Sequence, residues 1–427
     1  MTSQEAISYL ENQGWSKTRL GLDRTRELLE KLGNPQKRLK FIHVTGSNGK
    51  GSTCAMLESV LRRTGYRTGF YSSPHIENFR ERIQVNGKWI SEEDLIFHTM
   101  RVRTIAEKMS DHPSQFELVT AIGLDYFASR KCDIVVLEVG MGGALDSTNA
   151  IDAPEVAVIT NVGLDHQEYL GNSIEEIAQT KAGIIKAGSD VVCYDGAPSV
   201  TEIIKEKCLT AGANFHGVKN SRIHAPEMTL NGQRFLWDQQ PLQLSLLGKH
   251  QLRNAATALT VLEILIRRGW HIDEEAVRKG LAMTEWPARM ELLSKKPIVF
   301  LDGGHNPQCA EALAENLSAL FPRQKVVFLM GVLKDKDYPR MIEILTPFTQ
   351  QMICLTPSSD RALSAERLAE YLLRRGIRAE AADSVKEGIR LARKAAGRDG
   401  IIVAFGSLYL AGSIRNQMRI INRQPLD

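Results

Sequence analysis

The sequence predicts an α/β protein with two doubly wound, mainly parallel sheets. Runs of Val and Ile alternate with amphipathic helical patterns, which is typical of parallel strands covered on both faces. One of these runs leads directly into a glycine-rich turn and then a helix. A second alternating series begins near residue 295. We therefore expect two domains, 1–290 and 291–427, the second of them smaller and Rossmann-like.

The composition is that of a globular protein. The chain has 427 residues, of which 43% are hydrophobic and 24% are charged, which argues against a disordered or fibrous chain. The formal charge is +4, and the longest basic cluster, residues 36–40, is short. We therefore expect no nucleic-acid partner.

The cysteine pattern and the hydropathy of the sequence indicate in which cellular compartment the protein is expected. None of the six cysteines forms a CxxC pair and no histidine cluster accompanies them, so we expect reduced thiols in a cytoplasmic protein. The first residues lack the features of a signal peptide. No apolar run approaches the ~20 residues that span a bilayer. We expect a monomer without a membrane partner.

In the first domain, two short helices are followed by alternating strands and helices. Strands are expected at 41–44, 133–138, 156–160 and 190–193. Helices are expected at 92–108, 114–130, 173–186, 249–268 and 273–283. Segment 219–246 has short alternating runs with Gly, Asn and Pro turns, which favours a small antiparallel sheet.

The second domain repeats the alternation on a smaller scale. Strands are expected at 298–301, 326–329, 352–355 and 401–405. Helices are expected at 308–320, 337–346, 364–374 and 384–396. This order predicts a second doubly wound sheet.

The glycine-rich turn follows the first strand and has the features of a phosphate loop. Glycines let the backbone approach phosphates, and N–H groups at a helix start supply positive potential. Lys50 adds a mobile cation, and Ser52 or Thr53 can bind Mg²⁺. The spacing is shorter than the general pattern, and an ordinary glycine-rich turn is the alternative. The expected contacts with a nucleoside polyphosphate are Gly46, Asn48, Gly49, Lys50, Gly51, Ser52 and Thr53.

Residues 43–52, HVTGSNGKGS, resemble the phosphate loop of the Mur ligase superfamily. The extra Gly51 is typical of its folylpolyglutamate synthase and dihydrofolate synthase branch. Ala144 stands where that family usually has Arg. Further segments match the family in order, at 71–75, 81–83, 138–143, 145–149, 163–166, 181–186, 248–255, 286–289, 302–307 and 405–409.

The resemblance implies an ATP-dependent ligase that adds L-glutamate to the carboxylate of a folate. Amide formation is uphill in water, so the carboxylate first acquires a leaving group by phosphorylation. The glutamate amine then attacks the acyl phosphate, which has to be kept from water. Whether dihydropteroate is also an acceptor stays open.

The resemblance also implies two Mg²⁺ ions and a modified lysine. It makes Glu138, at the carboxyl end of an apolar strand, a Mg²⁺ ligand together with Ser52. It assigns a second Mg²⁺ to Ser73 and His166. It implies a CO₂-derived carbamate on Lys181, because a desolvated neutral lysine can react with CO₂. Each residue also has a structural alternative. Glu138 could be a surface charge at a strand end, and Ser73 a turn residue. His166 could be a helix cap or a hydrogen-bonded core residue, and Lys181 a surface lysine.

Both domains are expected to contact ATP. Asn254 and Arg289 match the family's ATP contacts, with Arg289 as a catalytic cation alongside Lys50, Lys181 and His166. Asp302 and His305 of the second domain match further nucleotide contacts. Domain closure would then assemble the site and exclude water. Alternatively, Arg289 could be only a linker residue, and Asp302 and His305 could be a pair that caps a turn.

Substrate contacts are expected from both domains. Asp146 resembles the acid that contacts the pterin, and Ser73, Pro74 and His75 border the same region. Ser407 lies at a strand-to-helix turn, which suits the carboxylate of incoming glutamate. Structural roles are equally compatible with these positions.

Other functions remain to be weighed. A ligase of the same superfamily could use another carboxylate acceptor. A wall-precursor acceptor is not expected, because only 44 residues precede Thr45 and the nucleotide-recognition domain of those ligases is larger. A non-catalytic nucleotide-binding protein and a phosphotransferase are the remaining classes. The joint presence of Lys50, Glu138 and Lys181 with Ser73 and His166 favours an enzyme.

Overall fold

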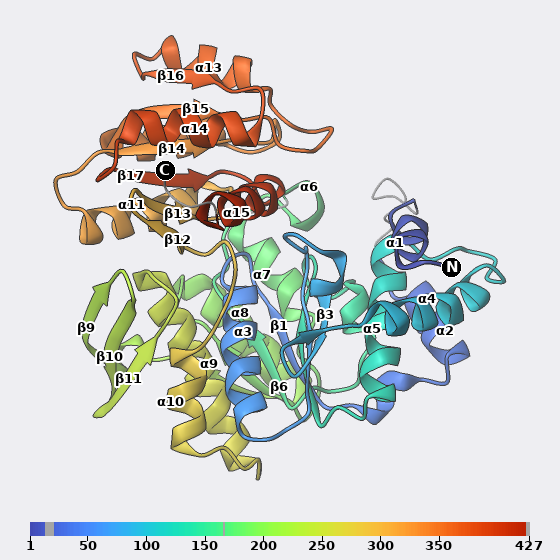
Figure 1. The fold of residues 1–427 in the computed structure, drawn as a ribbon. Coiled ribbons are helices and arrows are strands. Elements are labelled where there is room, and N and C mark those ends of the chain that lie inside the picture. Colours follow the sequence, from blue (N-terminus) through green and yellow to red (C-terminus); the bar gives the residue numbers. More distant parts are fainter. Residues whose placement is uncertain (13–20, 165–166, 424–427) are drawn as a thin grey trace. The chain divides into compact units, whose positions relative to one another are not determined.

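The computed structural model describes residues 1–12, 21–164 and 167–423 (Figure 1). The chain divides into two compact units. The first comprises Met1–His224, Leu236–Leu242 and Arg253–Thr284. The second comprises Ala225–Phe235, Gln243–Leu252 and Glu285–Asp427. Each unit contains a mainly parallel sheet with helices against it, so the predicted α/β class is confirmed.

The first unit contains an eight-stranded sheet in the order β4-β3-β2-β5-β1-β6-β7-β8. Its strands are β1 (Phe41–Thr45), β2 (Thr68–Tyr71), β3 (Ile83–Val85), β4 (Lys88–Trp89), β5 (Ile134–Glu138), β6 (Val156–Ile159), β7 (Asp190–Cys193) and β8 (Asn214–Gly217). β1 is central and runs parallel to β5 and β6, with Val44 opposite Glu138 and Thr45 opposite Ile159. The loops after these three strands therefore begin at one edge of the sheet.

Helices cover the first sheet, so every residue of β1 and β5 is buried. One core joins Val135 and Leu137 to α1 (Ser3–Glu11), α2 (Asp23–Lys31), α4 (Glu92–Ala106) and α5 (Gln115–Ser129). α3 (Lys50–Arg63) packs against β2 and β5, and α10 (Glu274–Ala282) packs against α3. α7 (Ile174–Ala182) and α8 (Pro198–Ala211) pack beside β6 and β7. In the described part of the chain, the remaining α-helices before residue 270 are the short α6 (Gln167–Leu170) and the long α9 (Lys249–Arg267).

The second unit contains a six-stranded sheet in the order β12-β13-β17-β14-β15-β16. Its strands are β12 (Glu291–Lys295), β13 (Ile298–Leu301), β14 (Val326–Met330), β15 (Thr349–Cys354), β16 (Ala379–Ala381) and β17 (Ile401–Phe405). Only the edge strand β12 is antiparallel to its neighbour among these described pairs. Its helices are α11 (Pro307–Leu320), α12 (Tyr338–Leu345), α13 (Ala365–Leu373), α14 (Val385–Ala396) and α15 (Leu408–Arg423).

The predicted strands and long helices are all present, with ends shifted by a few residues. Segment 219–246 forms a three-stranded sheet in the order β11-β10-β9, from β9 (Ile223–Thr229), β10 (Gly232–Trp237) and β11 (Gln240–Leu244). The strands that sequence patterns did not predict are β2, β3, β4, β8, β12 and β16. Five of these are edge or next-to-edge strands with exposed or half-buried residues, so their sequences lack a continuous apolar run.

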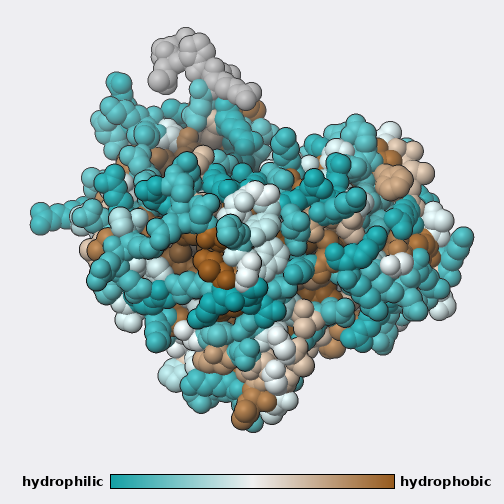
Figure 2. All heavy atoms as spheres, turned by 90° about the horizontal axis from the view of Figure 1, so that it is seen from below, coloured by the Kyte–Doolittle hydropathy of each residue, from teal (hydrophilic) through white to brown (hydrophobic). Residues whose placement is uncertain are grey.

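The surface is mainly hydrophilic and the cysteines are unpaired, as the sequence composition led us to expect. Hydrophilic side chains predominate on the face in Figure 2, with smaller hydrophobic areas among them. In the described part of the chain, no helix has the length and apolar character that a membrane crossing requires. All six cysteines are free, and five are buried.

The core of the second unit generates a stability prediction. Phe328 of β14 is fully buried, so Phe328→Ala should lower the free energy of unfolding by about 3–5 kcal/mol through the cavity it leaves. Amide hydrogen exchange along β14 measures this loss. The matched control is Phe97→Ala, because Phe97 is 61% exposed and should change stability by less than about 0.5 kcal/mol. Equal effects of the two variants would contradict the described core.

Candidate active site at the phosphate loop

The loop between β1 and α3 is closely packed at two glycines. Gly46 has φ 154°, and a Cβ on it would lie 1.8 Å from the Thr160 hydroxyl oxygen. Gly49 has φ 89°, and a Cβ on it would lie 2.5 Å from the Asn254 side-chain oxygen. Any larger residue would displace these neighbours. The loop therefore has a backbone path that only glycine fits.

Hydrogen bonds tie this loop to the end of β6. The backbone N–H groups of Ser47 and Asn48 donate to the Asn161 carbonyl at 2.8 and 3.3 Å. The Ser47 hydroxyl donates to the Gly163 carbonyl at 2.7 Å, and the Thr160 hydroxyl donates to the Asn48 carbonyl at 2.9 Å. These contacts fix the loop before any ligand contributes.

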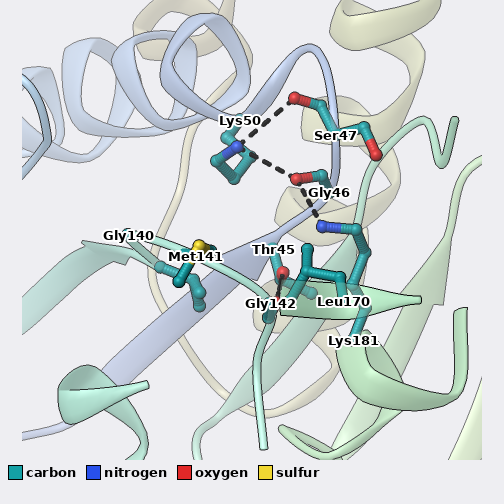
Figure 3. A pocket seen from close by; sticks show the side chains of 10 residues that line it. Thr45, Gly46, Ser47, Lys50, Gly140, Met141, Gly142, Leu170 and Lys181 are labelled. Carbon is teal, nitrogen blue, oxygen red and sulfur yellow. Dashed lines mark hydrogen bonds between the residues drawn. The ribbon is translucent and has the colours of Figure 1, made fainter. Parts of the chain in front are cut away.

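Two lysines converge on one carbonyl oxygen of the loop (Figure 3). Lys50 Nζ of α3 donates to the Gly46 carbonyl at 3.0 Å, and Lys181 Nζ of α7 donates to the same oxygen at 2.9 Å. The two nitrogens are therefore within about 6 Å, where two positive charges repel by about 3 kcal/mol at an effective dielectric constant of 20. Lys181 is only 2% exposed. An anion between the two groups would relieve this repulsion.

The pocket beside these lysines is narrow and is lined by the loops after β1 and β5 and by residues of α3, α6 and α7. Figure 3 shows Lys50, Lys181 and the backbone around Gly46 facing one another across it. The Thr45 hydroxyl donates to the Gly142 carbonyl at 2.5 Å, which joins the loop after β1 to the loop after β5. The lining residues are Thr45, Gly46, Ser47, Lys50, Val139, Gly140, Met141, Gly142, Leu170 and Lys181.

Oxygen donors suited to Mg²⁺ lie at the same sheet edge. Glu138 ends β5, is 4% exposed, and its carboxylate accepts a hydrogen bond from the Ser73 backbone N–H at 3.3 Å. Ser52 and Thr53 are buried in the first turn of α3, and the Thr53 hydroxyl has no hydrogen-bond partner among the described residues. His166 lies outside the described residues.

This donor set fits a magnesium ion that is carried by a nucleotide. Carboxylate and hydroxyl oxygens are hard donors, and Mg²⁺ usually takes one or two carboxylates with phosphate oxygens and water. In the described part of the chain, no three His, Cys, Asp or Glu side chains lie close enough to bind a metal together. The protein groups therefore suit a metal whose other ligands come from phosphates.

Asp146 lies inside the loop after β5 and is 6% exposed. Its carboxylate accepts hydrogen bonds from the Met141 N–H at 2.9 Å, the Thr148 N–H at 3.0 Å and the Thr148 hydroxyl. Burial raises the pKa of Asp146, and these hydrogen bonds oppose that rise. Because a carboxylate has about four acceptor positions, protein donors occupy most of them. The direct contact with a pterin stays a prediction.

The segment after β2 carries Ser73, Pro74 and His75. Pro74 is exposed and follows a cis peptide bond. His75 Nδ1 accepts a hydrogen bond from Arg82 Nε at 3.1 Å, and burial together with the Arg82 charge lowers the pKa of His75 to about 4. His75 is therefore neutral at pH 7, with its other ring nitrogen protonated.

In the second unit, Asp302 and His305 follow β13. Asp302 accepts hydrogen bonds from the N–H groups of Gly304 and Met290 at 2.8 and 2.9 Å. His305 Nδ1 lies 3.3 Å from the Gly303 carbonyl. Asp302 therefore connects the loop after β13 with the start of β12.

Arg289 and Ser407 belong to the same edge of this unit. Arg289 donates to the Ala288 carbonyl at 2.8 Å, and a Cβ on Gly303 would lie 2.9 Å from its guanidinium. Ser407 follows β17, is 5% exposed, and accepts a hydrogen bond from the Tyr409 N–H at 3.2 Å. The Gly406 N–H donates to the Gly304 carbonyl at 3.0 Å. The loops after β13 and β17 are thus joined.

Several residues without an assigned sequence role shape the first unit's site. The hydroxyls of Thr45, Ser47 and Thr160 all bond to backbone of a neighbouring loop. The sequence signal is a hydroxyl residue at or directly after the end of a buried strand. Leu145 and Leu164 are about half exposed, at 48% and 51%, in the loops after β5 and β6. They offer apolar surface at the edge that carries the pocket.

The crowding at Gly46 generates a binding prediction. Gly46→Ala should weaken ADP binding by at least about tenfold, because the new Cβ displaces Thr160 and the loop with it. Isothermal calorimetry with Mg-ADP measures the change. The control is Gly188→Ala, since Gly188 also has a positive φ of 76° but no heavy atom within 4 Å of its added Cβ. Unchanged binding in Gly46→Ala would refute the packing described.

Comparisons with known proteins agree with this geometry. The Mur ligase middle domain family matches residues 44–262, and the Mur ligase glutamate ligase domain family matches residues 288–408. The chain is 35% identical to a dihydrofolate synthase/folylpolyglutamate synthase of Bacillus subtilis, over 97% of this chain and 99% of the relative. It is 36% identical to a folylpolyglutamate synthase of Lacticaseibacillus casei, over 92% of each.

A solved structure extends the likeness to the fold. Escherichia coli FolC in complex with DHPP and ADP superposes with a TM-score of 0.86 and 30% identity, covering 99% of this chain and 98% of that one. The resemblance inferred from the motifs is thereby confirmed over nearly the whole length. The chain belongs to the Mur ligase family, in its folylpolyglutamate synthase and dihydrofolate synthase branch.

Proposed function

We propose that the chain is an ATP-dependent ligase that adds L-glutamate to the carboxylate of a folate through an acyl phosphate. The observation that carries this proposal is the convergence of Lys50 and Lys181 on the Gly46 carbonyl, inside a loop whose glycines leave no room for side chains. Such a site calls for a polyphosphate anion. The names of the relatives and the ADP and DHPP in the related structure support the same activity.

In this proposal the phosphate loop holds ATP and orients its terminal phosphate. Residues 46–53 contact the phosphates, Lys50 neutralises developing charge, and Asn254 packs over the loop at Gly49. Arg289 acts as a transition-state cation, and Asp302 and His305 contact the nucleotide from their own domain. These roles rest on the family resemblance and on the clustering of each set within its unit.

Two Mg²⁺ ions are part of the proposal. Ser52 and Glu138 would hold one ion, and Ser73 and His166 the other. When bound, such ions shield phosphate charge and polarise the transferred phosphoryl group. The bond from the Ser73 N–H to Glu138 supports two ion sites that lie next to each other.

Carbamylation of Lys181 is the further chemical proposal for this site. The Lys181 ammonium first loses one proton, and the neutral amine then adds to CO₂ with loss of a second proton. The product is an anion that still has one N–H to donate to Gly46. This exchange would turn repulsion from Lys50 into attraction. Close packing supports a fixed position, because a Cβ on Gly143 would lie 2.8 Å from the Lys181 carbonyl.

The acceptor and glutamate occupy separate regions in this proposal. Ser73, Pro74 and His75 border the acceptor, and a neutral His75 can donate a hydrogen bond to it. Asp146 shapes the same region through the backbone that it holds. Ser407 offers its hydroxyl and the start of α15 to the carboxylate of incoming glutamate.

The domains divide this work. Residues 1–290 bind ATP and the acceptor, and residues 291–427 supply the glutamate site and complete the ATP site on closure. We propose that the enzyme acts as a monomer in the cytoplasm. The six free cysteines support a reducing compartment.

A second candidate acceptor is dihydropteroate, which would make the enzyme a dihydrofolate synthase as well. The observation in its favour is the double name of the Bacillus subtilis relative. Ala144 is a reason to test acceptors broadly, because the family usually has Arg at this position. A Cβ on Gly183 would lie 2.3 Å from the Ala144 Cβ, so this loop packs directly on the end of α7.

Substrate dependence of ADP release tests the proposed activity. With Mg-ATP, we expect ADP only when both glutamate and an acceptor are present, because the amine has to resolve the acyl phosphate in each turnover. A coupled assay with reduced folate or dihydropteroate in separate tubes measures this. ADP release that needs no glutamate would indicate a phosphotransferase. Protein that binds ADP but turns over with neither acceptor would move the assignment to another carboxylate.

The proposed carbamate has a test that does not depend on turnover. Protein equilibrated with ¹³C-labelled bicarbonate should give a carbamate carbonyl signal in its NMR spectrum, and Lys181→Ala should lose that signal. The same variant should lose most activity and regain part of it with added short carboxylates. Lys186→Ala is the control, because Lys186 donates to the carbonyls of Asn149 and Ile151 away from Gly46. A spectrum that is unchanged in Lys181→Ala would refute the modification.

A further inference from the structure

His43 is a buried polar residue in the centre of β1 to which the proposed function gives no part. Its side chain is 0% exposed, two residues before Thr45 on the same face of the strand. Its Nε2 lies 2.9 Å from the Thr148 hydroxyl oxygen. Its Nδ1 is buried and has no hydrogen-bond partner among the described residues. An imidazole that served only to fill space would be disfavoured at this position.

The hydrogen bonds around Thr148 have one consistent direction. The single hydroxyl proton of Thr148 goes to the Asp146 carboxylate, which only accepts when ionised. The Thr148 oxygen therefore accepts the bond from His43, and His43 carries its proton on Nε2. The chain runs from imidazole to hydroxyl to carboxylate, and each bond polarises the next.

The far end of this chain holds backbone that lines the pocket. Asp146 accepts the Met141 N–H at 2.9 Å, and Met141 is a lining residue. Thr45, from the same strand as His43, donates to the neighbouring Gly142 carbonyl at 2.5 Å. β1 thus bears the phosphate loop at its end and also fixes, through two side chains, the loop that follows Glu138.

We propose that His43 is a positioning residue for the ligase reaction. Through Thr148 and Asp146 it sets the backbone of residues 141–142 against the phosphate loop, so that the pocket keeps the width the reacting groups need. The proposal rests on the proposed function for its kinetic consequence, but the direction of the hydrogen bonds does not.

The first test reads the imidazole itself. In the full chain with ¹⁵N-labelled histidine, the His43 signals should show a neutral ring protonated on Nε2, with no titration between about pH 5 and 8. Burial and the nearby Lys186 charge lower the pKa of His43 to about 3, which places its titration below that window. His43→Gln assigns the signals. A ring protonated on Nδ1, or one that titrates in this window, would overturn the proposal.

The second test is kinetic and uses paired variants. His43→Leu should lower kcat/KM for ADP release about tenfold, whereas His43→Gln, which can still donate to Thr148, should stay within about threefold of the wild type. Phe41→Leu is the control, because Phe41 is 3% exposed on the same face of β1 and lies outside the chain of bonds. It should leave kcat/KM unchanged even if it lowers stability.

A second pair covers the case in which His43→Leu does not fold. Thr148→Val keeps the shape and removes the hydroxyl, and Thr148→Ser keeps the hydroxyl, so only the former should lose kcat/KM. Equal kinetics for Leu and Gln at position 43, or for Val and Ser at position 148, would overturn the positioning role. If the wild type releases no ADP with any acceptor, the proposed function fails, while the imidazole spectrum still decides the bond direction.

Discussion

The carbonyl of Gly46 is the point on which the first unit's site depends. It receives Lys50 from the helix that follows it and Lys181 from a helix far along the chain. The loop can follow this path only because the backbone of Gly46 packs closely against Thr160 and that of Gly49 packs closely against Asn254. The phosphate loop, α7 and the end of β6 are thereby held in one arrangement, and a polyphosphate is the ligand whose charge matches it.

The same constraint explains why so many polar groups are buried at this sheet edge. Glu138, Asp146 and Lys181 are each less than a tenth exposed, which would be costly without hydrogen bonds. Glu138 and Asp146 accept backbone N–H groups, and Lys181 donates to a backbone carbonyl. Charged groups that hold backbone in place also hold the loops that carry them, so stability and site geometry have the same cause.

The sequence predicted the fold well where the strands are buried on both faces. The continuous runs at β1, β5, β14 and β17 were recognisable because helices cover them. β4 and β16 were not, because they are short edge strands whose side chains face solvent or are half buried. The candidate residues at strand ends were predictable for the same reason, since parallel strands deliver their following loops to one edge.

What the sequence could not predict is which polar groups satisfy one another. Nothing in the sequence indicated that the oxygens of Asp146 accept hydrogen bonds from Met141 and Thr148, and its predicted contact with a pterin stays a prediction. His43 was part of a strand pattern and of the phosphate-loop segment, but neither pattern indicates its hydrogen-bond partner, which lies 105 positions along the chain. Such pairs depend on side-chain packing between segments that no local period relates.

In the proposed reaction, the acceptor carboxylate becomes an acyl phosphate on this protein. The most direct test of this step is isotope transfer from an acceptor whose carboxylate is labelled with ¹⁸O. After turnover with Mg-ATP and glutamate, mass spectrometry of the released inorganic phosphate should find one ¹⁸O atom for each amide formed. Unlabelled phosphate, formed together with the amide product, would exclude the acyl phosphate.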